Sequence, residues 1–143
     1  MTRSLFQKIT LGIAGATTLA IGLCILVIPH PFYASYGIVL ADDASLLSEL
    51  RAPGAGLAVL GALMLWGIWN SAMRQVAQVA ALTVYIAFPA GRLVGLLVDG
   101  MPSGGILGAL AFEAGIAMLC LLAFRRGSRA SPLQGADTRA PVA

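Results

Sequence analysis

The sequence predicts an all-α protein, a polytopic membrane protein built as an antiparallel, up-and-down bundle of four transmembrane helices. Apolar residues make up 59% of the 143 positions and charged residues 10%, whereas soluble domains average roughly 45–50% and about 25%. The mean hydropathy is +0.89. Four apolar segments come close to the about 20 helical residues that cross a bilayer core about 30 Å thick. They are Ile9 to Ile28, Ala52 to Trp69, Val76 to Val98 and Ile106 to Phe124.

The first segment follows Arg3 and Lys8, as the apolar part of a secretory signal peptide follows basic residues. Its apolar run is too long for a signal peptide, and no small-x-small cleavage site comes after it. We therefore interpret it as a retained transmembrane helix.

The second segment contains Pro53, which cannot donate a helical hydrogen bond and crowds the preceding turn. We expect it to divide the helix, so that a separate turn or two from about Ser45 to Arg51 lies at the membrane surface. Asp43 is the expected N-cap of that turn, because its carboxylate accepts from unpaired backbone N–H groups. A cation site at Asp42 and Asp43 is the alternative, but two adjacent acids supply too few oxygens for Ca²⁺.

Polar residues recur every seven positions along the third segment, at Gln78, Tyr85, Arg92 and Asp99. This spacing places them on nearly one side of a helix. That side should face other helices rather than lipid. Pro89 is expected to kink the helix and to free a carbonyl that a neighbour or water satisfies.

Small residues at a spacing of four mark helix faces where backbones approach closely, because lipid supplies no hydrophobic force between helices. The predicted faces are Gly12, Ala16, Ala20 and Cys24; Gly54, Ala58 and Ala62; Gly91 and Gly95; and Gly105, Ala109, Glu113 and Ala117. Glu113 therefore lies on a contact face. The linkers Asn70 to Arg74 and Gly100 to Gly105 are short, which makes the helices that they join antiparallel neighbours.

The distribution of basic residues predicts the orientation, since Lys and Arg in short flanking segments stay on the cytoplasmic side. One side of the bundle receives Arg3, Lys8, Arg74, Arg125, Arg126, Arg129 and Arg139. Both termini are therefore expected in the cytoplasm, with the longer loop from His30 to Ser48 on the outer side. Residues 1–126 form the predicted membrane domain. Residues 127–143 lack an apolar period and are expected to be a disordered cytoplasmic tail.

Four ionisable residues lie in or at the edge of the predicted helices, where charges need partners. At about 1.5 Å per residue, their heights above the cytoplasmic end are about 18 Å for Glu113, about 25 Å for Arg92, about 28 Å for Arg51 and about 31 Å for Glu49. Arg92 is expected to form a bidentate pair with Glu113 of the adjacent helix. Glu49 and Arg51 would close the top of the bundle, which predicts an outward-opening polar pocket without net charge.

This charged cluster has a structural and a functional interpretation. Buried ion pairs can fix the register of helices while adding little stability, and intramembrane charges can also mark a ligand site. Proton-coupled transport through Glu113 is a weaker variant, since only Gln78 and Tyr85 extend the polar path inward. A membrane enzyme would use Glu113 as acid or base, with Arg92 or Arg51 holding an anionic group of a lipid-like substrate.

Familiar signatures of catalysis and of cofactor binding are absent from the sequence. One His and two Cys are too few for a metal centre of converging ligands, so we expect no metal and no cofactor. There is no Walker loop and no GxSxG motif. The isoelectric point of 9.3 follows from the cytoplasmic basic residues rather than from a nucleic-acid-binding stripe. Phe32, Tyr33 and Tyr36 are expected in an aromatic belt at the outer interface.

Several short motifs occur in a fixed order along three of the predicted helices. They are Ser48-Glu49-Leu50-Arg51-Ala52 with Gly54 and Gly56, then Arg92 with Asp99-Gly100-Met101-Pro102-Ser103, and then Glu113. In order and spacing they resemble a family of small bacterial four-helix inner-membrane proteins catalogued as a domain of unknown function. The resemblance extends over nearly the whole chain up to Arg126 and departs from the family pattern at the step from Ala52 to Pro53. It implies a bacterial cytoplasmic membrane and one shared site for the four charged residues.

We therefore predict a non-enzymatic integral membrane protein, either an accessory subunit or a binder of a small ligand or lipid. The predicted site residues are Glu49, Arg51, Arg92 and Glu113, with Tyr85, Asp99 and Gln78 as further polar residues. The expected partners are membrane lipids, a small amphipathic ligand or another membrane protein, including a second copy of this chain. No nucleic acid is expected among them.

Overall fold

A computed structural model of the chain describes residues 2–124, which contain five α-helices and no β-strand. The helices are α1 (Thr2–Val27), α2 (Pro29–Ala34), α3 (Ala44–Trp69), α4 (Arg74–Val98) and α5 (Gly104–Phe124). All except the short α2 are long and apolar enough to cross a membrane. The predicted all-α, four-span architecture is therefore confirmed. The predicted tail, 127–143, and the domain boundary at 126 lie outside the described residues.

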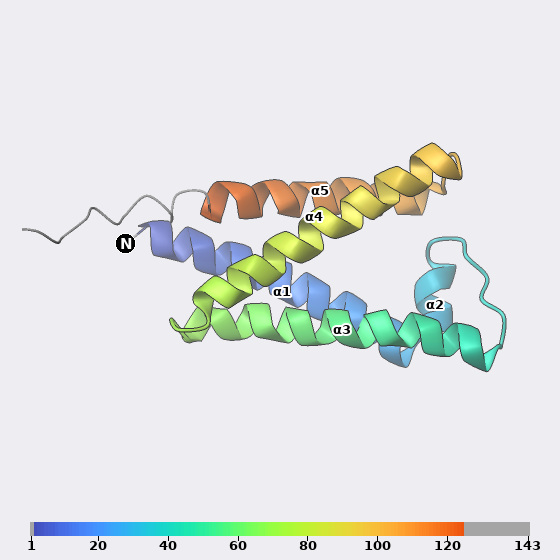
Figure 1. Cartoon of the computed structure of the whole chain (residues 1–143), viewed down its shortest axis with the longest axis horizontal. Helices are drawn as coiled ribbons and strands as arrows, with labels where there is room; N and C mark the ends of the chain where they lie inside the picture. Colours follow the sequence, from blue (N-terminus) through green and yellow to red (C-terminus); the bar gives the residue numbers. More distant parts are fainter. Residues whose placement is uncertain (1, 125–143) are drawn as a thin grey trace, which may run out of the picture.

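The four long helices run alternately up and down, and helices that follow one another in the chain are neighbours (Figure 1). Helix α3 packs along α1 and α4 packs against α3, while α5 contacts both α4 and α1. One end of the bundle, here called the terminal end, holds the start of α1, the turn between α3 and α4, and the end of α5. The opposite end, here called the loop end, holds α2, residues 35–43 and the turn between α4 and α5.

Helix α3 continues through Pro53 and begins at Ala44, so the expected division of this segment is wrong. A proline in a helix removes one backbone hydrogen-bond donor, and Gly54, which follows it, lies directly against Ile25 of α1. The expected N-cap is confirmed, because the Asp43 carboxylate accepts from the backbone N–H of Leu46 at 2.7 Å.

Helices α1 and α3 approach so closely that their backbones are in contact. A Cβ atom on Gly22 would overlap the backbone of Ala58, and one on Gly61 would overlap the backbone of Leu19. Glycine is required at both crossings, because the atoms that a side chain would meet belong to a helix backbone and cannot move aside.

The face that α1 presents to α3 differs from the predicted one. Ala16 and Ala20 are exposed, whereas Gly15, Thr18 and Gly22 are buried. A helix rich in glycine and alanine carries several overlapping stripes of small residues, so spacing alone does not identify the stripe that meets the partner. The prediction for α3 was better, since Gly54 and Ala58 do lie at the contact.

The terminal end contains a packed core from all four long helices. Its buried side chains include Leu11, Met64, Ala77, Ala81 and Cys120. Gly67 of α3 has no room for a side chain because Ala77 of α4 fills that position. The side-chain amide of Gln7 in α1 donates to the Ala123 carbonyl of α5 at 3.1 Å. The helices are therefore closely joined at this end.

At the loop end, α2 and residues 35–43 join the two helix pairs. The hydroxyl of Ser103, before α5, donates to the carbonyl of Tyr36 at 2.8 Å. His30 of α2 lies with its Nε2 atom 3.0 Å from Oδ1 of Asp42. Hydrogen bonds and polar contacts of the connecting segments, rather than a packed core, therefore join the helices at the loop end.

Candidate functional site

The centre of the candidate site is an ion pair between α4 and α5. Arg92 donates from Nε to Oε2 of Glu113 at 2.9 Å and from Nη2 to Oε1 at 3.0 Å. The Glu113 side chain is 10% exposed and the Arg92 side chain 28%. The bidentate pair expected from the sequence is therefore present in the structure.

The tilt of α4 explains how these two residues meet. Counting along straight helices places Arg92 about 7 Å farther from the terminal end than Glu113. Helix α4 crosses the bundle diagonally, from the end of α3 toward the start of α5 (Figure 1). This tilt lowers Arg92 along the bundle axis, and its long side chain spans the remaining separation.

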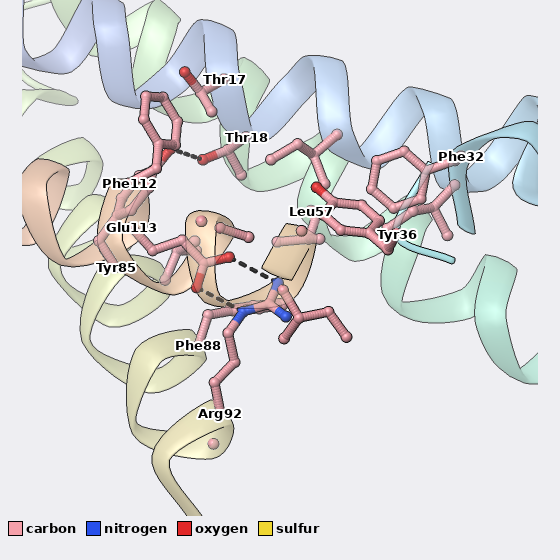
Figure 2. Close-up of a pocket in the computed structure, with 18 of the residues that line it drawn as sticks. Thr17, Thr18, Phe32, Tyr36, Leu57, Tyr85, Phe88, Arg92, Phe112 and Glu113 are labelled. Atoms are coloured by element: carbon pink, nitrogen blue, oxygen red, sulfur yellow. Dashed lines mark hydrogen bonds and ion pairs between the residues drawn. The ribbon is translucent and has the colours of Figure 1, made fainter. Parts of the chain in front are cut away.

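The ion pair lies in the wall of a cavity of about 890 Å³ that opens between the α1–α3 pair and the α4–α5 pair. Most of the lining is apolar, from residues such as Ile21, Ile25, Phe32, Leu57, Phe88 and Phe112. Figure 2 shows Arg92 extending from α4 to Glu113, with Phe32 and Tyr36 beyond the pair. A volume of this size lies within the range of about 300–1,000 Å³ typical of small-molecule sites.

Tyr85 forms the polar boundary between the cavity and the packed core. Its hydroxyl accepts from Thr18 Oγ1 at 3.1 Å and donates to the carbonyl of Ala14 at 3.0 Å. Figure 2 shows the first of these bonds linking α4 to α1. Both side chains are buried and line the cavity. The bonds fix the phenol where the cavity ends.

Two tyrosines predicted for the interfacial belt also line the cavity. Tyr33 belongs to α2 and Tyr36 follows it, and both face the space beside Arg92. Burial raises the pKa of Tyr33 above its ordinary value, and the positive charge of Arg92 partly offsets this effect. Its hydroxyl therefore stays protonated and available as a hydrogen-bond donor.

Glu49 and Arg51 do not join the cluster, in contrast to the expectation. Both are exposed, and neither forms an ion pair within residues 2–124. Leu47 and Leu50 continue the partly buried stripe of α3, so Glu49 and Arg51 point about 100° to either side of Leu50. Because α3 is continuous, this turn cannot rotate to bring the two charges over the cavity.

The remaining polar residues of the third span occupy separate places. Asp99 is the exposed C-cap residue of α4. Gln78 is half-buried near the terminal end and has no hydrogen-bond partner among the described residues. Of the predicted stripe, only Tyr85 and Arg92 reach the cavity.

Sequence reasoning did not single out Thr17 and Thr18, which line the cavity from α1. The available signal was two adjacent hydroxyl residues inside an otherwise apolar segment. Thr18 also lies one turn after Ala14, which places it on the buried stripe of α1.

Residues 2–124 contain no cluster of three or more His, Cys, Asp or Glu side chains that could hold a metal ion.

The fold and the site together define a multi-pass membrane protein, a four-helix bundle with an ion pair in the wall of a largely apolar cavity. The chain belongs to the family described as Domain of unknown function (DUF4345), which matches residues 6–124. The resemblance to an uncharacterised family is thereby confirmed. No curated protein and no solved structure matches the chain.

Proposed function

We propose that this protein binds one amphipathic molecule in its cavity, with the Arg92–Glu113 pair at the polar end of the site. The observation that carries the proposal is a cavity of about 890 Å³ with a bidentate ion pair in its wall. Apolar walls suit a hydrocarbon portion, and a few placed polar groups suit its head. Membrane lipids belong to this class of ligand, as do smaller lipid-like metabolites.

A purely structural role for the pair is less consistent with this geometry. A pair that only fixes helix register needs no empty space beside it, because geometry and mutual attraction are what repay its desolvation. Here the side chains around the pair leave space. Glycines 91 and 108 lie in the cavity wall, and a Cβ atom added to either would have no neighbouring atom within 4 Å. A methyl group at either position would narrow the space at no steric cost.

The same contacts favour binding over catalysis or proton transport. Both carboxylate oxygens of Glu113 accept from Arg92, so the acid is already engaged rather than directed at a substrate. Beyond Tyr85, toward the terminal end, the buried side chains of Met64, Ala81 and Cys120 fill the core. A proton path would have to cross this apolar layer.

For localisation, we propose a bacterial cytoplasmic membrane with both termini in the cytoplasm. Lys8 and Arg74 lie at the terminal end, whereas Asp42, Asp43 and Asp99 lie at the loop end, which agrees with the positive-inside rule. The cavity would then face the outer half of the membrane. A membrane-impermeant thiol reagent tests this on single cysteines introduced at Ser71 or Asp42 in a chain whose Cys24 and Cys120 are replaced by alanine. The proposal expects labelling of intact cells at 42 only.

The test of binding is native mass spectrometry of the protein extracted gently from its own membrane. The comparison is between the wild type and the double variant Arg92→Gln with Glu113→Gln, which removes both charges but keeps a hydrogen-bonding pair between α4 and α5. The proposal expects a bound molecule in the wild type and its loss in the double variant. The matched control is Arg51→Gln, an exposed position outside the cavity. A wild-type protein that carries no molecule and also binds no added amphipathic probe would contradict the proposal.

A further inference from the structure

The hydrogen bonds of Arg92 leave one edge of its guanidinium group unused. A guanidinium group carries five N–H donors in a planar fork. Glu113 occupies the side formed by Nε and Nη2. The other side, formed by Nη1 and the second N–H of Nη2, has no acceptor among residues 2–124.

This unused edge is accessible from the cavity. Arg92 lines the cavity and its side chain is 28% exposed, against 10% for Glu113. Nη1 is also not among the buried side-chain atoms that lack a partner. Both members of the pair line the cavity, and the guanidinium group of Arg92 is the more exposed of the two.

Hydroxyl donors lie on the same side of the cavity. Tyr33 and Tyr36 line it from α2 and the following turn, and the charge of Arg92 acts on Tyr33. A planar pair of N–H groups matches the two oxygens of a carboxylate or phosphate. Apart from Arg92 and Glu113, the lining, which includes Ile21, Leu57 and Phe112, contains no charged side chain that could bind a second polar group of a ligand.

We infer that the ligand is an amphipathic oxyanion, a single apolar chain that ends in a carboxylate or a phosphate monoester, bound by the unused edge of Arg92. This inference rests on the proposed function and specifies its head group. The oxyanion and Glu113 then share one guanidinium group. Removing the charge of Glu113 should therefore strengthen binding, since one of two negative charges disappears.

The experiment uses four probes with the same chain: dodecanoate, dodecyl phosphate, dodecanol and dodecylamine. Each is titrated against the purified protein in a non-ionic detergent, at an alkaline pH that ionises the acids, and the bound fraction is read by native mass spectrometry. The proteins are the wild type, Glu113→Gln, the double variant Arg92→Gln with Glu113→Gln, and the control Arg51→Gln.

We expect at least one acidic probe to bind the wild type about tenfold or more tightly than the alcohol and the amine, the size expected of charge-assisted hydrogen bonds. Glu113→Gln should bind that acid more tightly still, the double variant should lose the preference, and Arg51→Gln should keep it. The acid that binds more tightly, dodecanoate or dodecyl phosphate, identifies the oxyanion as a carboxylate or a phosphate.

The outcomes separate this inference from the proposed function. Equal or better binding of dodecanol or dodecylamine would overturn the oxyanion and leave an amphipathic site in place. Weaker binding of the acids to Glu113→Gln would also overturn it. A molecule that co-purifies while none of the probes binds would contradict the single-chain oxyanion alone. An empty protein that also binds no probe would contradict both.

Discussion

The two helix pairs of this protein use small residues in opposite ways. Between α1 and α3, glycines 22 and 61 allow backbone contact and leave no space for a methyl group. In the second pair, Gly91 of α4 and Gly108 of α5 line the cavity. A Cβ atom added to either would have no neighbouring atom within 4 Å. One pair is held by close packing, and the other carries the ion pair. Glycine content alone therefore does not distinguish a packing surface from a binding surface.

Alanine at Gly61 is expected to have the largest effect on stability. The added methyl group meets the backbone of Leu19, so the free energy of unfolding should fall by about 3 kcal/mol or more. Gly56 lies on the same helix, and a Cβ atom added there would have no neighbouring atom within 4 Å. Gly56→Ala should therefore leave the free energy of unfolding unchanged or raise it by about 0.5–1 kcal/mol. Thermal unfolding in detergent measures both. Equal melting of the two variants would show that α1 and α3 are not in backbone contact.

Breaking the ion pair should have the next largest effect. Arg92→Leu leaves Glu113 as a lone charge between helices and should lower the free energy of unfolding by about 2.5 kcal/mol. The double change Arg92→Leu with Glu113→Leu should recover most of this loss, because no charge remains. The same unfolding measurement checks it. If the double variant is as unstable as the single one, the two residues do not act as a pair.

Removing the hydroxyl of Tyr85 should cost less. Tyr85→Phe deletes a donor and an acceptor that join α4 to α1 through Thr18 and Ala14, which is expected to lower stability by about 1 kcal/mol. Tyr33→Phe serves as the control, because that hydroxyl has no protein hydrogen-bond partner within residues 2–124. A loss of equal size in both variants would argue against a structural role for the Tyr85 bonds.

The sequence was sufficient to predict the features that depend on composition and on contacts between chain neighbours. Four apolar segments predicted four membrane-type helices, and the short linkers predicted their antiparallel order. The Arg92–Glu113 pair followed from approximate depth and from the need of each charge for a partner. These arguments use only helical geometry and the energetic cost of a charge in the membrane.

Rotation of the helices about their axes could not be predicted in the same way. The placement of Glu49 and Arg51 depended on whether Pro53 interrupts α3, and that helix is continuous through the proline. The contact stripe of α1 depended on the shape of α3, which the spacing of small residues does not encode. The cavity arises from where α4 diverges from α1, a tertiary property.

The most direct test of the account is to fill the cavity without disturbing the packed helix pair. Gly108→Leu places a side chain in the cavity wall. The control is Gly115→Leu on the same helix: a Cβ atom there also meets nothing within 4 Å, but Gly115 does not line the cavity. Thermal unfolding and native mass spectrometry are measured on both variants and on the wild type. A ligand cavity predicts that neither variant is less stable than the wild type and that only Gly108→Leu loses the bound molecule. A Gly108→Leu protein that retains the molecule would contradict the account.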